Sequence, residues 1–107
     1  MAPTPDNSSA TSPVIISNVF RESLAKLTGR EQKAVEAAAA DLQANPAHPS
    51  LQFHRLEKGT DRRLWSARVS GKVRLIISRS DTGLQLCYVG HHEKAYHWAE
   101  RRHPANV

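Results

Sequence analysis

Two adjacent histidines near the end of the chain have side chains suited to chemistry. His91 and His92 follow Gly90 at the end of an apolar run, and Tyr96 comes about one helical turn later. Imidazole exchanges protons near neutral pH, and a glycine lets the backbone turn or approach another molecule closely. We therefore expect a proton-transfer site in this stretch. The competing interpretation is that His91 is a hydrogen-bonded core histidine and that Tyr96 packs.

Basic residues upstream would place positive charge beside these histidines. They are Arg62, Arg63, Arg68, Lys72 and Arg74. Side chains alternate along a strand, so Arg68 and Arg74 are expected together on the open face of a sheet whose other face meets helices. The loop and turn around them would add the other three cations, which predicts one concentrated positive surface. Alternatively, both arginines are ordinary solvated sheet positions.

Arginine beside histidine suits chemistry on a phosphate. A guanidinium holds two phosphate oxygens and stays charged, and a positioned histidine or tyrosine moves the proton. RNA carries its own nucleophile, the 2′-OH, so an enzyme can cleave it without a metal by positioning and charge stabilisation. The chain has no HExxH or paired CxxC spacing, so we expect no metal site and no cofactor.

The composition fits one domain with an anionic partner. The 107 residues carry a net charge of +5 with the histidines neutral. Such a balance favours nucleic acid, an anionic membrane or an acidic protein, or only aids solubility. The single cysteine, Cys87, cannot form an internal disulfide and is expected to be buried. With no apolar stretch near the ~20 residues of a membrane span and no secretion signal, we expect a cytoplasmic protein without membrane contact.

The beginning of the chain changes composition abruptly. Residues 1–12 are small, polar and proline-containing, which predicts a disordered tail before a single domain over residues 13–107. A β-branched strand over residues 14–16 is expected to lead into a helix over residues 18–27, with Asn18 as its cap.

The remaining elements follow from caps and apolar runs. Thr28 and Glu31 have the spacing of a capping box, which predicts a second helix that ends before Asn45. Three strands and a short helix are then expected, over residues 64–69, 73–79, 84–89 and 93–102, with Gly90 ending the last strand. The fold class is α+β: an N-terminal strand, a helical hairpin, a three-stranded antiparallel meander and a short C-terminal helix, with helices on one sheet face.

Three segments carry a resemblance to a known family. They are Leu64–Arg68, Val73–Ile77 and Tyr88–Tyr96. With the order strand, helix, helix, three strands, the chain resembles the RelE/ParE toxin superfamily over about residues 14–103. The likeness is closest to RelE-type members whose last strand ends in a Val-Gly-His-basic pattern before a tyrosine. The resemblance implies a small sheet cupped by a helical hairpin, ribosome-dependent mRNA cleavage, and an antitoxin that wraps the toxin.

The resemblance also implies roles for individual residues. Arg74 sits where the RelE branch keeps a phosphate-binding arginine, and Arg68 is similar to a further basic strand residue. His92 falls near a second basic catalytic position, and Tyr96 matches a tyrosine that stacks on or activates the substrate. His91 with His92 is similar to the histidine that some relatives use near the chain end as acid or base.

The chain departs from the RelE branch in two ways. Leu64 and Ser66 stand where the branch has lysines, and a histidine stands where an arginine is usual. Either proton transfer has moved to the histidines or activity is weak or lost. The second case keeps open a non-catalytic ParE-like gyrase inhibitor or a nucleic-acid-binding module.

The sequence thus predicts a RelE-like toxin of a toxin-antitoxin system, cleaving mRNA on the ribosome by metal-independent 2′-OH attack. The expected partners are that mRNA and a cognate antitoxin. The expected catalytic residues are Arg74, His91, His92 and Tyr96, and the expected substrate-binding residues are Arg62, Arg63, Arg68 and Lys72. Of the two histidines, His92 is favoured for the chemistry because it shares strand parity with Leu84, Leu86 and Tyr88.

Overall fold

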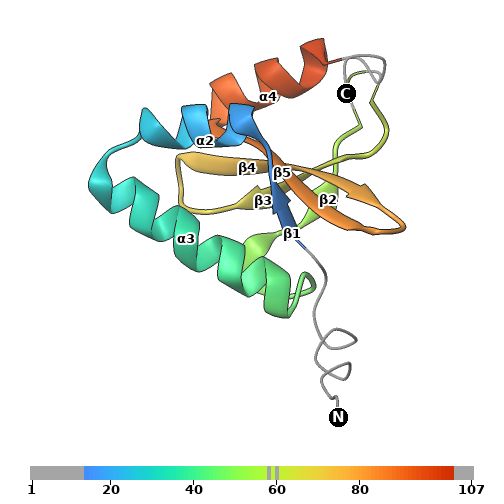
Figure 1. Ribbon diagram of the computed structural model, residues 1–107, viewed down its shortest axis with the longest axis horizontal. Coiled ribbons are helices and arrows are strands. Elements are labelled where there is room, and N and C mark those ends of the chain that lie inside the picture. Colours follow the sequence, from blue (N-terminus) through green and yellow to red (C-terminus); the bar gives the residue numbers. More distant parts are fainter. Residues whose placement is uncertain (1–13, 58, 60, 103–107) are drawn as a thin grey trace.

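A computed structural model describes residues 14–57, 59 and 61–102, which form a five-stranded sheet with helices on both faces (Figure 1). The expected tail over residues 1–12 lies outside the described residues. In chain order the elements are β1 (Val14–Ile16), α2 (Asn18–Ala25), α3 (Gly29–Ala44), the 3-10 helix η1 (Pro49–Leu51), β2 (His54–Arg55), β3 (Leu64–Arg68), β4 (Val73–Ser80), β5 (Gly83–His91) and α4 (His92–Arg101). The predicted α+β class is confirmed.

The strand order across the sheet is β1-β5-β4-β3-β2. β1 runs parallel to β5, whereas β2, β3, β4 and β5 pair antiparallel with their neighbours. The expected three-stranded meander is therefore the centre of the sheet. β1 and the two-residue β2 extend it at the two edges.

The helical hairpin begins at side-chain caps. The capping box of α3 is confirmed, because Thr28 Oγ1 accepts from the Glu31 backbone N–H (3.1 Å) and Glu31 Oε1 accepts from that of Thr28 (3.0 Å). Asn18 was the wrong cap for α2. Ser17 leaves β1 in an extended conformation and its hydroxyl accepts from the Phe20 N–H (3.0 Å), whereas Asn18 is already helical. α2 also ends at Ala25, two residues before the predicted end.

Both faces of the sheet are covered. The main core lies between the sheet and the α2–α3 hairpin, and the expected apolar set of β3 and β4 faces it: Trp65, Ala67, Val69, Val73, Leu75 and Ile77. A second cluster lies under α4: Leu64, Ile76, Cys87, Ala95 and Ala99. The face that we expected to be open is thus covered along its middle. It carries buried apolar side chains of its own, and the amphipathic α4 turns back over them (Figure 1).

A β-bulge in β5 changes which residues share a face. Ile76 of β4 lies opposite Tyr88, but the next residue of β4, Ile77, lies opposite Leu86, so Cys87 is an extra residue. Cys87 and Tyr88 therefore both belong to the α4 side, while Leu86 and Val89 face the hairpin. The expected common parity of Leu84, Leu86 and Tyr88 is wrong for Tyr88. Cys87 is buried as expected, and this burial raises the pKa of its thiol.

Gly90 does not end the last strand. β5 continues through Gly90 to His91, which pairs with Val73 of β4, and α4 starts at the next residue. A Cβ on Gly90 would lie 3.1 Å from the Tyr88 ring, so this glycine allows a close approach of that ring to the backbone. Among the described residues no helix is long and apolar enough to cross a membrane.

Candidate functional site

One end of the sheet brings together the β3–β4 turn and the β5–α4 junction. Arg68 and Arg74 are direct cross-strand partners, and the backbone N–H of His92 donates to the Lys72 carbonyl (2.7 Å). This end contains a shallow hollow of about 590 Å³, lined by Gly71, Lys72, Arg74, His91, His92, Glu93 and Lys94. The predicted meeting with the histidine pair therefore occurs for Arg74 and Lys72, whereas Arg68 lies beside Arg74 on the next strand and does not line the hollow.

Arg74 is held at this hollow by the adjacent turn. Its Nη1 donates to the carbonyls of Ser70 and Val73, the latter at 3.1 Å, so the guanidinium is fixed at the turn. Among the described residues, no protein acceptor is found for its Nε and Nη2. Those donors, together with the exposed ammonium of Lys72, are suited to an anion such as a phosphate.

The two histidines make different contacts. The His91 Nε2 donates to Glu31 Oε2 of α3 (2.9 Å), whereas the His92 ring meets the Tyr96 ring edge-on with centroids 4.5 Å apart. The two imidazoles have different surroundings because His91 ends β5 and His92 begins α4. The hydrogen bond from the Thr28 backbone N–H lowers the pKa of Glu31 most, and the contact with His91 lowers it further, which keeps the carboxylate ionised.

Tyr96 turns its polar end toward the sheet. Its hydroxyl forms a hydrogen bond with Ser66 Oγ (3.2 Å), and Ser66 is fully buried. The half-buried Tyr96 ring also packs against the second core cluster under α4. In this structure Tyr96 supports His92 and the start of α4, and it is not among the residues that line the hollow.

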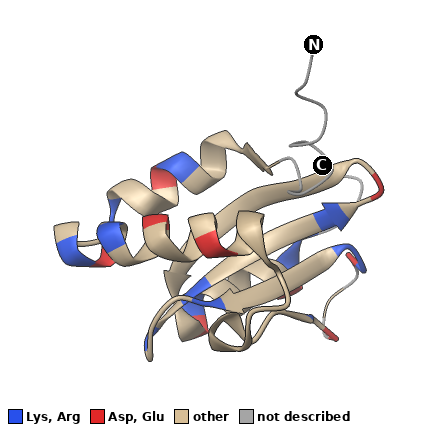
Figure 2. Ribbon diagram, turned by 90° about the horizontal axis from the view of Figure 1, so that it is seen from below, with Lys and Arg blue, Asp and Glu red and all other residues tan. Residues whose placement is uncertain are grey.

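Arg62 and Arg63 do not join this site. The backbone N–H of Arg79, near the end of β4, donates to the Arg63 carbonyl, while Arg68 pairs with Arg74 near the start of β4. The two loop arginines thus lie at the opposite end of the sheet, and Figure 2 shows Lys and Arg at both ends. Arg63 instead pairs with the buried carboxylate of Asp61 (3.0 Å). The single concentrated surface that we expected is wrong for these two residues.

Two residues of the site were not identified from the sequence. Glu31 was recognised only as a helix cap, because it is 60 residues from His91 in the chain and only the fold brings them together. Lys94 was read as part of a helix, and its place beside the hollow depends on where α4 begins. Across residues 14–57, 59 and 61–102, no three His, Cys, Asp or Glu side chains converge as a metal site.

Comparison with known proteins shows which solved structures have a similar fold. No family model matches the chain, and no curated protein matches it by sequence. Among solved structures, YafQ from Escherichia coli superposes with a TM-score of 0.66 at 16% identity, over 79% of this chain and 98% of that one. A chain of the RelBE2 toxin-antitoxin complex from Mycobacterium tuberculosis gives 0.64 at 27% identity, over 77% and 99%. This chain has the fold of the RelE-like toxin superfamily.

The RelE-like fold extends to an archaeal structure. A chain of the RelE–RelB complex from Pyrococcus horikoshii gives a TM-score of 0.61 at 21% identity, over 76% of this chain and 94% of that one. The described part of the chain therefore spans nearly the whole length of these RelE-like chains. The superfamily resemblance that was drawn from the strand and histidine motifs is confirmed at the level of the fold.

Proposed function

We propose that this RelE-like protein is the toxin of a toxin-antitoxin system and cleaves mRNA on the ribosome without a metal. The observation that carries the proposal is the hollow at the end of the sheet, where Lys72, Arg74 and both histidines line one surface. A phosphate seated there would meet the fixed guanidinium of Arg74, the exposed ammonium of Lys72 and two imidazoles at once. The superfamily fold supports the toxin role, and the side chains support phosphate chemistry.

The proposed reaction uses the 2′-OH of the RNA as its nucleophile. Arg74 and Lys72 hold the scissile phosphate, with Arg68 on the neighbouring strand beside Arg74. The 2′-oxygen attacks phosphorus, the bond to the 5′-oxygen breaks, and His91 and His92 exchange the protons. The products are a 2′,3′-cyclic phosphate and a 5′-hydroxyl. Arg62 and Arg63 lie too far along the sheet to hold the same phosphate.

The test is cleavage of mRNA in a purified translation system. Arg74→Ala should reduce the cleavage rate at least about 100-fold, because one preorganised donor to a developing anion is worth about that much. Arg21→Ala, which removes an exposed arginine of α2, should leave the rate unchanged. Equal cleavage by wild type and Arg74→Ala would contradict the proposal. Intact mRNA together with gyrase–DNA cleavage complexes would favour the ParE-like alternative.

We also propose that a cognate antitoxin covers the β1 edge of the sheet. The large apolar side chains exposed in the described residues are Ile15, Ile16 and Val19, all in β1 and the start of α2. Val19 lines a hollow of about 670 Å³ together with the stacked rings of Tyr88 and Trp98. Its other lining residues are Ser17, Gln85, Lys94, His97, Arg101 and Arg102. Apolar anchors ringed by cations fit an acidic amphipathic segment.

The antitoxin surface can be tested with the protein encoded beside this one. Val19→Glu should weaken their complex at least about tenfold, since it places a charge in the apolar part of the surface. The exposed Glu36→Gln change on α3 should leave the affinity unchanged. An unchanged affinity for Val19→Glu in titration calorimetry would place the antitoxin elsewhere.

A further inference from the structure

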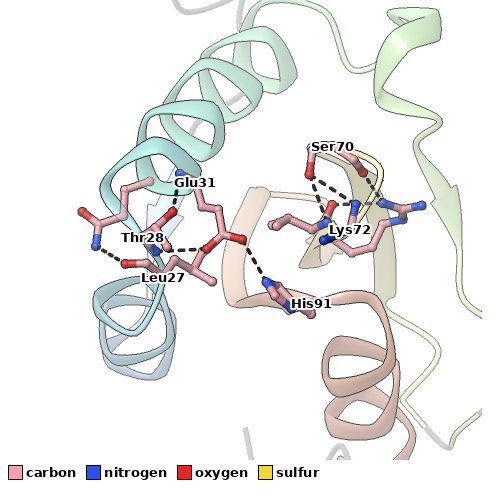
Figure 3. Close-up of polar contacts among 9 residues, drawn as sticks. Leu27, Thr28, Glu31, Ser70, Lys72 and His91 are labelled. Carbon is pink, nitrogen blue, oxygen red and sulfur yellow. Dashed lines mark hydrogen bonds and ion pairs between the residues drawn. The ribbon is translucent and has the colours of Figure 1, made fainter.

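Glu31 divides its two carboxylate oxygens between two parts of the fold. Oε1 accepts from the Thr28 backbone N–H (3.0 Å) and completes the cap of α3. Oε2 accepts from the His91 imidazole at the end of β5 (2.9 Å) (Figure 3). The Glu31 side chain is 25% exposed and the His91 side chain 53%, so the pair lies at the surface, and His91 also lines the hollow at the end of the sheet.

This geometry fixes where the proton of His91 sits. The Thr28 N–H and then the His91 contact lower the pKa of Glu31, and an ionised carboxylate can only accept hydrogen bonds. The Nε2 of His91 must therefore carry a hydrogen. In the neutral imidazole the other nitrogen, Nδ1, is then the acceptor. Glu31 thus leaves His91 with one nitrogen able to take a proton, at the rim of the hollow.

We propose that Glu31 is a positioning residue that makes His91 the general base of RNA cleavage, an inference that rests on the proposed function. His91 Nδ1 takes the proton of the 2′-OH while a lone pair of the 2′-oxygen forms the bond to phosphorus. The bond between phosphorus and the 5′-oxygen breaks, and its electron pair takes a proton from His92. Both histidines then re-equilibrate with water. The Glu31 carboxylate stabilises the imidazolium that forms on His91.

The contacts of His92 suit the second role. Its backbone N–H is tied to the Lys72 carbonyl, and its ring rests on the edge of Tyr96. Among the described residues no carboxylate contacts its ring, so nothing there selects an accepting nitrogen as Glu31 does for His91. The charged groups that share the hollow with both imidazoles are Lys72, Arg74, Glu93 and Lys94.

Glu31→Gln separates the proton effect from the helix cap. Glutamine serves at this position of a capping box, so its oxygen can keep the Thr28 N–H while its NH2 group points at His91. That NH2 donates, so His91 Nε2 must become the acceptor and the hydrogen moves to Nδ1. In single-turnover cleavage on programmed ribosomes, the maximal rate should fall about 10- to 100-fold, and the half-saturating ribosome concentration should change less than about twofold.

Two controls bracket this variant. Glu36→Gln makes the same chemical change at an exposed position of the same helix, and it should cleave like wild type. Thr28→Ala removes the hydroxyl of the cap but leaves the Glu31–His91 pair, so it should lower stability without changing the maximal rate. His91→Ala should lose more than Glu31→Gln, about 100-fold or more.

Nitrogen-15 NMR of the His91 ring gives a readout that a purely structural role would not move. Wild type should show the Nε2–H tautomer at high pH, and Glu31→Gln the Nδ1–H tautomer. The role of Glu31 is overturned if Glu31→Gln keeps either the wild-type rate or the Nε2–H tautomer. The proposed function still stands in that case, provided that wild type cleaves and Arg74→Ala does not. If wild type itself leaves mRNA intact, the proposed function fails and the inference fails with it.

Discussion

At the scale of single residues, Asp61 is a carboxylate on which the stability of the fold depends. Its side chain is fully buried, and it accepts from the Arg63 backbone N–H and Nε, both at 3.0 Å, with Arg102 Nε 3.6 Å away. Burial raises the pKa of Asp61, but the hydrogen bonds from Arg63 and the charge of Arg102 outweigh it, so the pKa lies below its ordinary value. A buried carboxylate with such partners is costly to lose.

Asp61→Ala should lower the free energy of unfolding by about 2–4 kcal/mol, because it leaves Arg63 and Arg102 without their shared carboxylate. Since the folded pKa is depressed, the contribution of Asp61 is fully present above its unfolded pKa of about 4. It is lost as the pH falls through the folded pKa. Urea denaturation at pH 7 and at pH 3 should show the gap between variant and wild type narrowing in acid. Asp81→Ala, at an exposed turn, is the matched control.

The residue types predicted part of the site, but the geometry of the site could be seen only in the folded structure. Arg74 and the two histidines were identified from strand alternation and a local motif, and they do line one hollow. Arg63 was misplaced because its nearness in sequence to Arg68 was taken as nearness in space, although a strand separates them. The pairing of Glu31 with His91 has no local signal at all.

At the scale of elements, α4 decides how much of the sheet is accessible. Ala95 and Ala99 are its fully buried residues, and they let the helix approach β4 and β5 closely. The amphipathic pattern of this segment predicted a helix correctly. It did not reveal that this helix covers the second face, because Leu64, Ile76 and Cys87 had not been recognised as one cluster.

Ala99→Leu should push α4 away from the sheet and lower the free energy of unfolding by about 1–3 kcal/mol, the usual cost of overpacking a core. Lys94→Leu, at an exposed position of the same helix, should stay within about 0.5 kcal/mol of wild type. Chemical denaturation monitored by tryptophan fluorescence measures this, because Trp98, one of the two tryptophans, stacks on Tyr88 beside the second cluster. Equal stability of both variants would show that α4 packs loosely.

At the scale of the whole molecule, Lys and Arg residues lie at both ends of the sheet and along the helices, so the positive charge behind the net +5 is not gathered in one place. The composition correctly indicated a basic surface, but a sum of charges carries no information about where they lie. The strand register places Arg68 with Arg74 at one end and Arg63 with Arg79 at the other. RNA binding at the proposed site should therefore depend on a few local cations and not on the net charge.

Salt dependence of RNA binding measures how many cations are engaged. If Arg68, Lys72 and Arg74 each neutralise one phosphate, the affinity for a short single-stranded RNA should fall with salt with a log–log slope of about −2. Lys72→Ala should reduce the magnitude of that slope by about 0.7, whereas Arg62→Ala, at the far end, should leave it unchanged. Fluorescence anisotropy across a salt series provides both slopes. A slope change for Arg62→Ala would show that the RNA spans the sheet.

The extra residue in β5 has a consequence for how this chain tolerates insertions and deletions. From Cys87 onward, every side chain of the strand faces as it does because one residue has been added to the alternation. Deleting Cys87 would restore a regular ladder in which Leu86 faces the hairpin, Tyr88 faces α4 and Val89 faces the hairpin, as they do now. His91 would keep its partner Val73 and its side of the sheet. A single lost codon at this position would thus remove the bulge and its buried thiol while leaving the orientation of the site unchanged, whereas the loss of Val89 would turn Gly90 and His91 to the other face.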